Sequence, residues 1–225
     1  MSASVFASVV FLKIQEFARR PVSEQARLRA QLEAVVAVTA AELEPAGRIV
    51  LEASDGAVLV VLDDPRGALR LAQRALAAGA AGLPLSAGLN HGAVQLTGGK
   101  RNEGMAGDGI AVAASIAEFA APPRLLAARA FREALAEAAP GAEVALAPAG
   151  TFTDAGLRGH ELFGPDRRAS QRRAWRYTAA AVAAVIVALG ASIGARIAKD
   201  GEEAFLEAVG AKYQTLVERV KFPSR

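Results

Sequence analysis

The feature that most constrains this chain is an uninterrupted apolar run near its C-terminus. Residues 177–195 read YTAAAVAAVIVALGASIGA and contain no charged side chain over nineteen positions. At about 1.5 Å per residue, a helix of this length comes close to crossing the ~30 Å hydrocarbon core of a bilayer. An Ala-rich helix buried in a globular protein is the alternative, but such helices usually keep a polar face. We therefore predict a transmembrane helix over residues 177–197.

The flanks of this run predict its orientation. Trp175 and Tyr177 are aromatic residues of the kind that sit at a membrane interface. Basic side chains crowd the N-terminal side: Arg167, Arg168, Arg172, Arg173 and Arg176. The positive-inside rule then places a domain of residues 1–164 in the cytoplasm at the cell inner membrane, with residues 165–176 as a basic linker. Attraction to anionic lipid explains this cluster, and with a net charge of +3 we expect no nucleic-acid partner.

The segment beyond the run, residues 198–225, is predicted to form an extracytoplasmic amphipathic helix. Its apolar residues recur at helical spacing: Phe205, Val209, Tyr213, Leu216 and Val220. Such a helix can lie on the membrane interface, pair with its copy or dock on a partner, and the sequence does not choose among these. Gly190 and Gly194 form a G-x-x-x-G pattern, which favours pairing of two membrane helices.

The first 164 residues alternate between strand-like and helix-like segments. No secretory signal is evident over residues 1–12, and the absence of cysteine excludes disulfides and thiol chemistry. Asp55-Gly56 lies between two β-rich runs and predicts a hairpin. Strands are expected over 5–12, 48–52, 57–62, 85–89, 93–97, 124–127, 144–147 and 159–163, and helices over 22–43, 65–78, 109–119 and 130–137. This order predicts an α+β domain, an α/β sandwich whose sheet is covered by helices.

Several short motifs in this order resemble the class III adenylate/guanylate cyclase homology domain. Residues 85–94, LSAGLNHGAV, are similar to that family's R-I-G-I-H-x-G strand, with Asn90-His91-Gly92 at its turn. Residues 107–116, GDGIAVAASI, are similar to its G-D-x-V-N-x-A-A-R-L helix start, and Leu157-Arg158-Gly159 to its late L-K/R-G turn. The resemblance covers about residues 5–163. It implies a ferredoxin-like domain that forms a head-to-tail dimer with two active sites at the interface.

The resemblance also implies a two-metal reaction, and this chain departs from the metal site. Two aspartates of the family hold the ions that activate the ribose 3′-hydroxyl. The first aspartate position is Lys13, which places a cation where a metal should bind, and Asp55 alone matches the pair. Glu16, three residues further on, is the nearest carboxylate that could replace the missing one, but in a strand it would face the side opposite to Lys13.

The other half of the implied site is changed as well. The two positions that read the base correspond to Leu51 and Gly104, the ribose asparagine to Ala111, and the transition-state arginine to Ser115. Each polar side chain is replaced by a smaller or apolar one. Because both halves are altered, a complementary partner subunit would not restore a complete site.

Simpler interpretations stand beside these. Asp55 suits a tight turn whatever the activity, and His91 is expected to be structural. The glycine-rich loop over residues 98–104 contains Lys100 and Arg101, which could contact phosphate, but it lacks the spacing of a P-loop and is expected to be a solvated loop.

Three functional hypotheses follow. The leading one is a catalytically silent cyclase-like domain, dimeric and membrane-bound, that binds a protein partner or a nucleotide and needs no cofactor. The second is a divergent cyclase that makes a cyclic nucleotide from ATP or GTP, with Mg²⁺ or Mn²⁺ at Asp55 and further ligands. The third is a membrane scaffold that works through residues 201–225.

Overall fold

The computed structural model describes residues 4–99, 102–153 and 159–166, together with 178, 181–188, 191–192 and 195. Over residues 96–99 and 102–105 it describes the backbone only. The chain divides into two compact units, Met1–Asp166 and Arg167–Arg225. Each unit is described here by itself.

The first unit consists of strands and helices in the mixed order that its sequence predicts. The strands are β1 Ser4–Ile14, β2 Arg48–Ala53, β3 Gly56–Val61, β4 Leu85–Gly99, β5 Asn102–Ala106, β6 Leu125–Ala128, β7 Leu146–Thr153 and β8 Gly159–Pro165. The helices are α1 Val22–Ala40, α2 Pro65–Gly79, α3 Asp108–Phe119 and α4 Arg129–Ala138. The α+β class is therefore confirmed.

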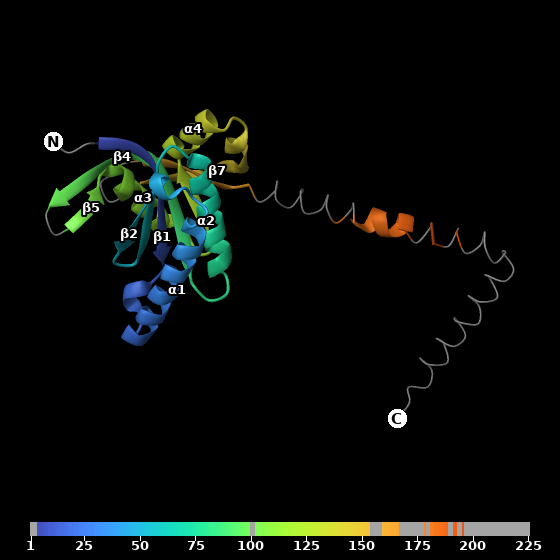
Figure 1. Ribbon diagram of the computed structural model, residues 1–225, viewed down its shortest axis with the longest axis horizontal. Coiled ribbons are helices and arrows are strands. Elements are labelled where there is room, and N and C mark those ends of the chain that lie inside the picture. The colour runs from blue at the N-terminus through green and yellow to red at the C-terminus, as the bar shows by residue number, and fades with distance from the viewer. Residues whose placement is uncertain are drawn as a thin grey trace, which may run out of the picture. The chain divides into compact units, whose positions relative to one another are not determined.

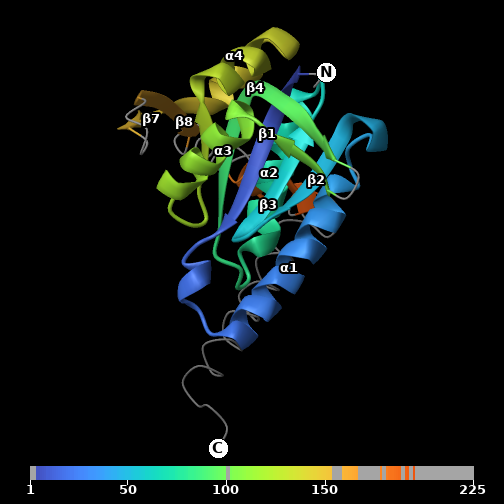
Figure 2. The ribbon, with the colours of Figure 1, turned by 90° about the vertical axis from the view of Figure 1, so that its left-hand side faces the viewer.

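These strands form one sheet in the order β2-β3-β1-β4-β6-β8-β7, and β5 pairs with β4 outside this path. The first four strands in this order, β2, β3, β1 and β4, pair antiparallel. Together with α1 and α2 they form the ferredoxin-like arrangement. β6 joins the other edge of β4 in parallel, and the β7–β8 hairpin completes the sheet. Figure 2 shows α4 at the end of the sheet that carries β7 and β8.

Alternate residues of β1 face the two sides of this sheet. Val10, Leu12 and Ile14 join the main core, to which α1, α2 and α4 contribute. Val9 and Phe11 join a second apolar cluster on the opposite side, where α3 packs. In Figure 1, α1 and α2 are seen together beside the strands. Because strand side chains alternate, Lys13 lies on the α3 side, next to Phe11.

Two of the expected local structures are wrong. Asn90-His91-Gly92 is not a turn between two strands but lies within the continuous β4, which pairs with β1 from Leu85 to Gln95. Pairing with a central strand overrides the turn preference of Asn and Gly. The expected solvated loop is a hairpin in its described part, since Gly98 and Gly99 of β4 pair with Glu103 and Asn102 of β5.

A smaller correction concerns the chain before β7. The strand expected over 144–147 starts as a 3-10 turn, Ala142–Ala145, and β7 follows it. Lys100, Arg101 and the Leu157-Arg158 pair lie outside the described residues.

In the second unit, the described residues 178, 181–188, 191–192 and 195 are helical. Among the described residues, no helix is long and apolar enough to cross a membrane. The rest of the run over 177–195 and the whole of 198–225 lie outside the described residues. The transmembrane helix and the amphipathic helix stay predictions, and so does the scaffold hypothesis that depends on them.

Candidate functional site

Lys13 lies at the centre of a three-residue ion cluster with Asp55 and Glu118. Its Nζ is 2.5 Å from Asp55 Oδ2 and 2.5 Å from Glu118 Oε2. The Lys13 side chain is 15% exposed, Asp55 is 29% exposed and Glu118 is 62% exposed. The ammonium is therefore held between two carboxylates in a partly buried position.

Asp55 is placed by the β2–β3 hairpin, as its Asp-Gly sequence predicts. Gly56 pairs with Lys13 of β1, and Ile14 N donates to Asp55 O at 2.8 Å. A Cβ on Gly56 would lie only 2.0 Å from Leu12 O. Gly56 is thus required because the hairpin approaches β1 so closely, which brings Asp55 beside Lys13.

Glu118 is placed by the close packing of α3 on β4. A Cβ on Gly88 would lie 2.1 Å from Ala113 O, so the helix can rest directly on the strand backbone. Gln15 Nε2 lies 2.6 Å from Ser86 Oγ and 3.1 Å from Ala117 O, which ties the end of β1 to the last turn of α3. These contacts hold the helix where Glu118 reaches Lys13.

The electrostatics of this cluster favour a charged lysine. Burial by itself would lower the pKa of Lys13, but hydrogen bonds and charge attraction from Asp55 and Glu118 outweigh it and raise that pKa above its ordinary value. One cation and two carboxylates leave the cluster with one net negative charge.

A cavity of about 470 Å³ opens beside the cluster. It is lined by Phe11, Lys13, Asp55, Ala114, Ser115, Glu118, Phe119 and Thr153. Leu51 is not among these lining residues, and its side chain packs from β2 against the second apolar cluster. The cavity is therefore open beside Lys13.

The structure brings together some of the predicted site positions and separates others. Lys13, Asp55 and Ser115 line one cavity, where the Ser115 hydroxyl donates to Ala111 O at 3.1 Å. Ala111 is exposed one turn earlier on α3, and Gly104 pairs with Thr97 in the β4–β5 hairpin. Glu16 follows the end of β1 and pairs with Arg19, so it does not reach the cluster.

Glu118 is the one site residue that sequence reasoning missed. It follows Ser115 by three positions on α3, so helical spacing places both on one face. This spacing could have linked Glu118 to the site in the sequence, but the packing of α3 on the sheet is what places that helix face beside Lys13.

The cluster does not fit a divalent metal ion. Mg²⁺ and Mn²⁺ take several oxygen ligands, whereas Lys13 offers three N–H donors and a like charge. Within the part of the chain that the structure describes, no three His, Cys, Asp or Glu side chains form a group that could hold a metal.

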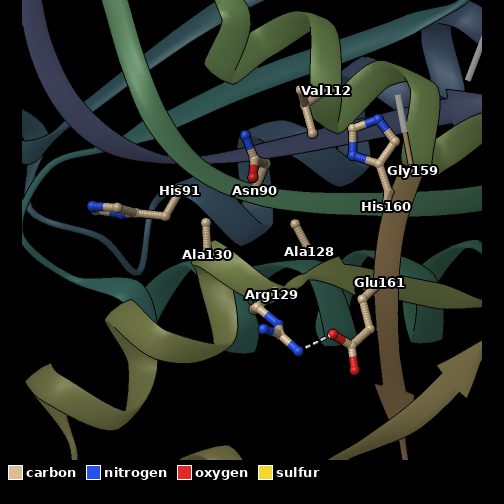
Figure 3. A pocket seen from close by; sticks show the side chains of 9 residues that line it. All are labelled: Asn90, His91, Val112, Ala128, Arg129, Ala130, Gly159, His160 and Glu161. Carbon is tan, nitrogen blue, oxygen red and sulfur yellow. Dashed lines mark hydrogen bonds and ion pairs between the residues drawn. The ribbon is translucent and has the colours of Figure 1, made fainter. Parts of the chain in front are cut away.

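A second cavity, of about 570 Å³, lies beyond the end of β6 and is shown in Figure 3. Arg129 and Glu161 form an ion pair at its margin. Both histidines of the chain line it. His91 Nδ1 lies 3.2 Å from Ser8 Oγ, and burial lowers the pKa of this imidazole, which fits the structural role expected for it.

Comparison with known proteins relates the fold to nucleotide cyclases. No family model and no curated protein matches the sequence. The adenylyl cyclase CyaB from P. aeruginosa is similar in structure, with a TM-score of 0.54 and 15% identity over 74% of this chain and 96% of that chain. The guanylate cyclase domain of RhGC from Catenaria anguillulae, solved with GTP, has a TM-score of 0.55 and 15% identity over 73% and 98%.

A guanylyl cyclase domain from Blastocladiella emersonii, described as dimeric, has a TM-score of 0.52 and 15% identity over 74% of this chain and 99% of that chain. The first unit therefore folds like adenylyl and guanylyl cyclase catalytic domains.

Proposed function

We propose that this chain is a membrane-anchored, cyclase-like module that does not turn over nucleoside triphosphates and acts in signalling through pairing and partner binding. The observation that carries the proposal is the position of Lys13 Nζ, 2.5 Å from the carboxylates of both Asp55 and Glu118. An ammonium at the expected first metal position satisfies these carboxylates inside the protein.

Charge balance supports the absence of turnover. A nucleoside triphosphate needs cations to gather its charge and to activate the attacking hydroxyl. The Lys13–Asp55–Glu118 cluster instead carries one net negative charge, and its cation, Lys13, is already paired with two carboxylates. Ser115, Ala111 and Leu51 supply no replacement for the polar groups that stabilise the transition state or read the base.

A homodimer is the proposed form of this module. Ile49, Leu51 and Ala53 lie partly buried on the α3 side of the sheet, at its β2 edge, where they extend the second apolar cluster. An apolar surface of this kind fits an interface. The dimeric cyclase domain from Blastocladiella emersonii and the G-x-x-x-G pattern at Gly190 and Gly194 support the same state.

The proposal is tested by assaying the full chain, purified in detergent, with ATP or GTP and either Mg²⁺ or Mn²⁺. We expect no cyclic nucleotide above the level of a no-enzyme control. Clear product formation that disappears in Asp55→Ala would overturn the proposal.

A divergent cyclase is the second candidate, because Asp55 and Glu118 do converge on one point. If Lys13 moved away on substrate binding, these two carboxylates would be available to a metal. This alternative predicts Mn²⁺-dependent product that is lost in Glu118→Gln and kept in Glu16→Gln, whose carboxylate pairs with Arg19 instead.

A further inference from the structure

The crevice beyond β6 arises from the shortness of that strand. β6 pairs with Ala87–Leu89 of β4 on one side and with β8 through Ala127 and Ala128 on the other. After Ala128 the chain turns into α4, while β4 and β8 both extend further. In open α/β sheets, ligands commonly bind in a crevice outside the carboxyl ends of the strands.

Small residues keep this crevice open. Ala128, Ala130 and Gly159 form part of its lining, and Val112 of α3 covers one side (Figure 3). The volume of the space, about 570 Å³, lies within the usual range of small-molecule sites.

In the described part of the chain, the margin of the crevice carries one positive and one negative side chain, Arg129 and Glu161. Arg129 Nη2 pairs with Glu161 Oε2, and the two side chains are 62% and 41% exposed. In Figure 3 the two side chains lie below the other labelled residues and are joined by a dashed line. An exposed ion pair contributes little to stability, so its partners can be exchanged readily for those of a ligand.

A buried carboxamide adds a hydrogen-bonding group at the opposite wall. Asn90 is 6% exposed and its Nδ2 donates to Gly109 O at 3.3 Å. In Figure 3 its oxygen points toward the start of α4, where Ala128 and Ala130 lie. Burying the Asn90 carboxamide costs free energy of desolvation, and a hydrogen bond from a polar ligand would offset part of that cost.

We propose that this crevice binds a small zwitterion of the free α-amino acid class. Arg129 would receive the ligand carboxylate and Glu161 its ammonium, while the remainder of the ligand extends toward Asn90. Among the described residues, Arg129 and Glu161 give the margin one charge of each sign, which favours a ligand that carries both signs over a simple anion or cation. The inference goes beyond the proposed function and does not depend on it.

The test uses the full chain in detergent and the standard L-amino acids as probes. Thermal shift identifies the amino acids that bind, and calorimetry gives their affinities. We expect at least one with a dissociation constant below about 1 mM. Its N-acetyl and methyl-ester derivatives, which each lose one charge, should bind at least about tenfold more weakly.

Two variants and one matched control locate the site. Arg129→Gln and Glu161→Gln should each weaken binding at least about tenfold. Arg74→Gln breaks a second exposed Arg–Glu pair, Arg74–Glu42, whose side chains are 59% and 44% exposed, and should leave binding unchanged. The proposal is overturned if no amino acid binds the wild-type chain, if the N-acetyl derivative binds as well as the free amino acid, or if both glutamine variants bind like wild type.

Discussion

The cavity beside Lys13 and the crevice beyond β6 differ little in size and strongly in how their charges are placed. Beside Lys13, a space of about 470 Å³ borders a lysine that is 15% exposed and already paired with two carboxylates. Beyond β6, a space of about 570 Å³ borders an arginine that is 62% exposed. Volume alone therefore does not decide what binds. Charges that are paired in a partly buried position stabilise the fold, whereas an exposed ion pair at a margin can exchange its partners for those of a ligand.

Of the substitutions considered, Lys13→Asp should have the largest effect on stability, because it removes the cation that pairs the two carboxylates beside the first cavity. It places a third carboxylate beside Asp55 and Glu118, so the free energy of unfolding without metal should fall by roughly 3–5 kcal/mol, the scale of an uncompensated buried charge. Three carboxylates are suitable ligands for Mn²⁺, which should restore much of the loss. Chemical and thermal unfolding with and without Mn²⁺ measure both effects. A variant that Mn²⁺ does not stabilise contradicts the prediction.

Lys13→Met removes the cation without adding a charge, and should lower the free energy of unfolding by roughly 2–4 kcal/mol. The folded-state pKa of Lys13 is raised above the ordinary 10.5, so its contribution is complete below that pH and is lost as pH rises through the folded value. Unfolding measured from about pH 7 to 11 should therefore show a constant difference from wild type that narrows only above pH 10.5. A difference that already narrows at neutral pH would contradict the assignment.

Glu118→Gln should have a smaller effect, about 0.5–1 kcal/mol, because this carboxylate is 62% exposed and solvent screens it. The matched control is Glu16→Gln, which removes a carboxylate of 63% exposure that pairs with Arg19 on the surface. The control should change the free energy of unfolding by less than about 0.5 kcal/mol. Equal effects in the two variants would mean that Glu118 is an ordinary surface residue.

Ala130→Leu should have the smallest effect on stability. It tests the crevice beyond β6, which Ala130 lines. Ala130 is exposed at the start of α4, so a larger side chain there should change the free energy of unfolding by less than about 0.5 kcal/mol. The added atoms would extend into the open crevice. A loss above about 2 kcal/mol in chemical unfolding would show that the space is packed, as in a core.

Much of the fold could be predicted from the sequence because local signals and tertiary structure agree. The Asp55-Gly56 turn, the helix after Asp64 and the helix that begins near Asp108 are all present, and Asp64 accepts from Gly67 N as an N-cap. The order of these segments predicted the α+β class, and the motifs over residues 85–94 and 107–116 carried the resemblance to the cyclase fold.

The errors occur where long-range contacts decide. Asn90 and Gly92 favour a turn locally, yet pairing of β4 with β1 keeps them in a strand. Lys13 and Asp55 could be identified by position, but Glu118 lies 105 residues after Lys13 and belongs to a common residue type. Its role requires that α3 rest on Gly88, a contact that no local pattern encodes.

A lysine between two carboxylates has a consequence for how this module responds to its surroundings. A bound metal ion exchanges with the medium, so the stability of any structure that depends on it changes with the concentration of that ion. An ammonium on a covalent stem is always present at its site. We therefore expect the junction of β1, the β2–β3 hairpin and α3 to keep its geometry when chelators are added or the divalent-ion concentration changes.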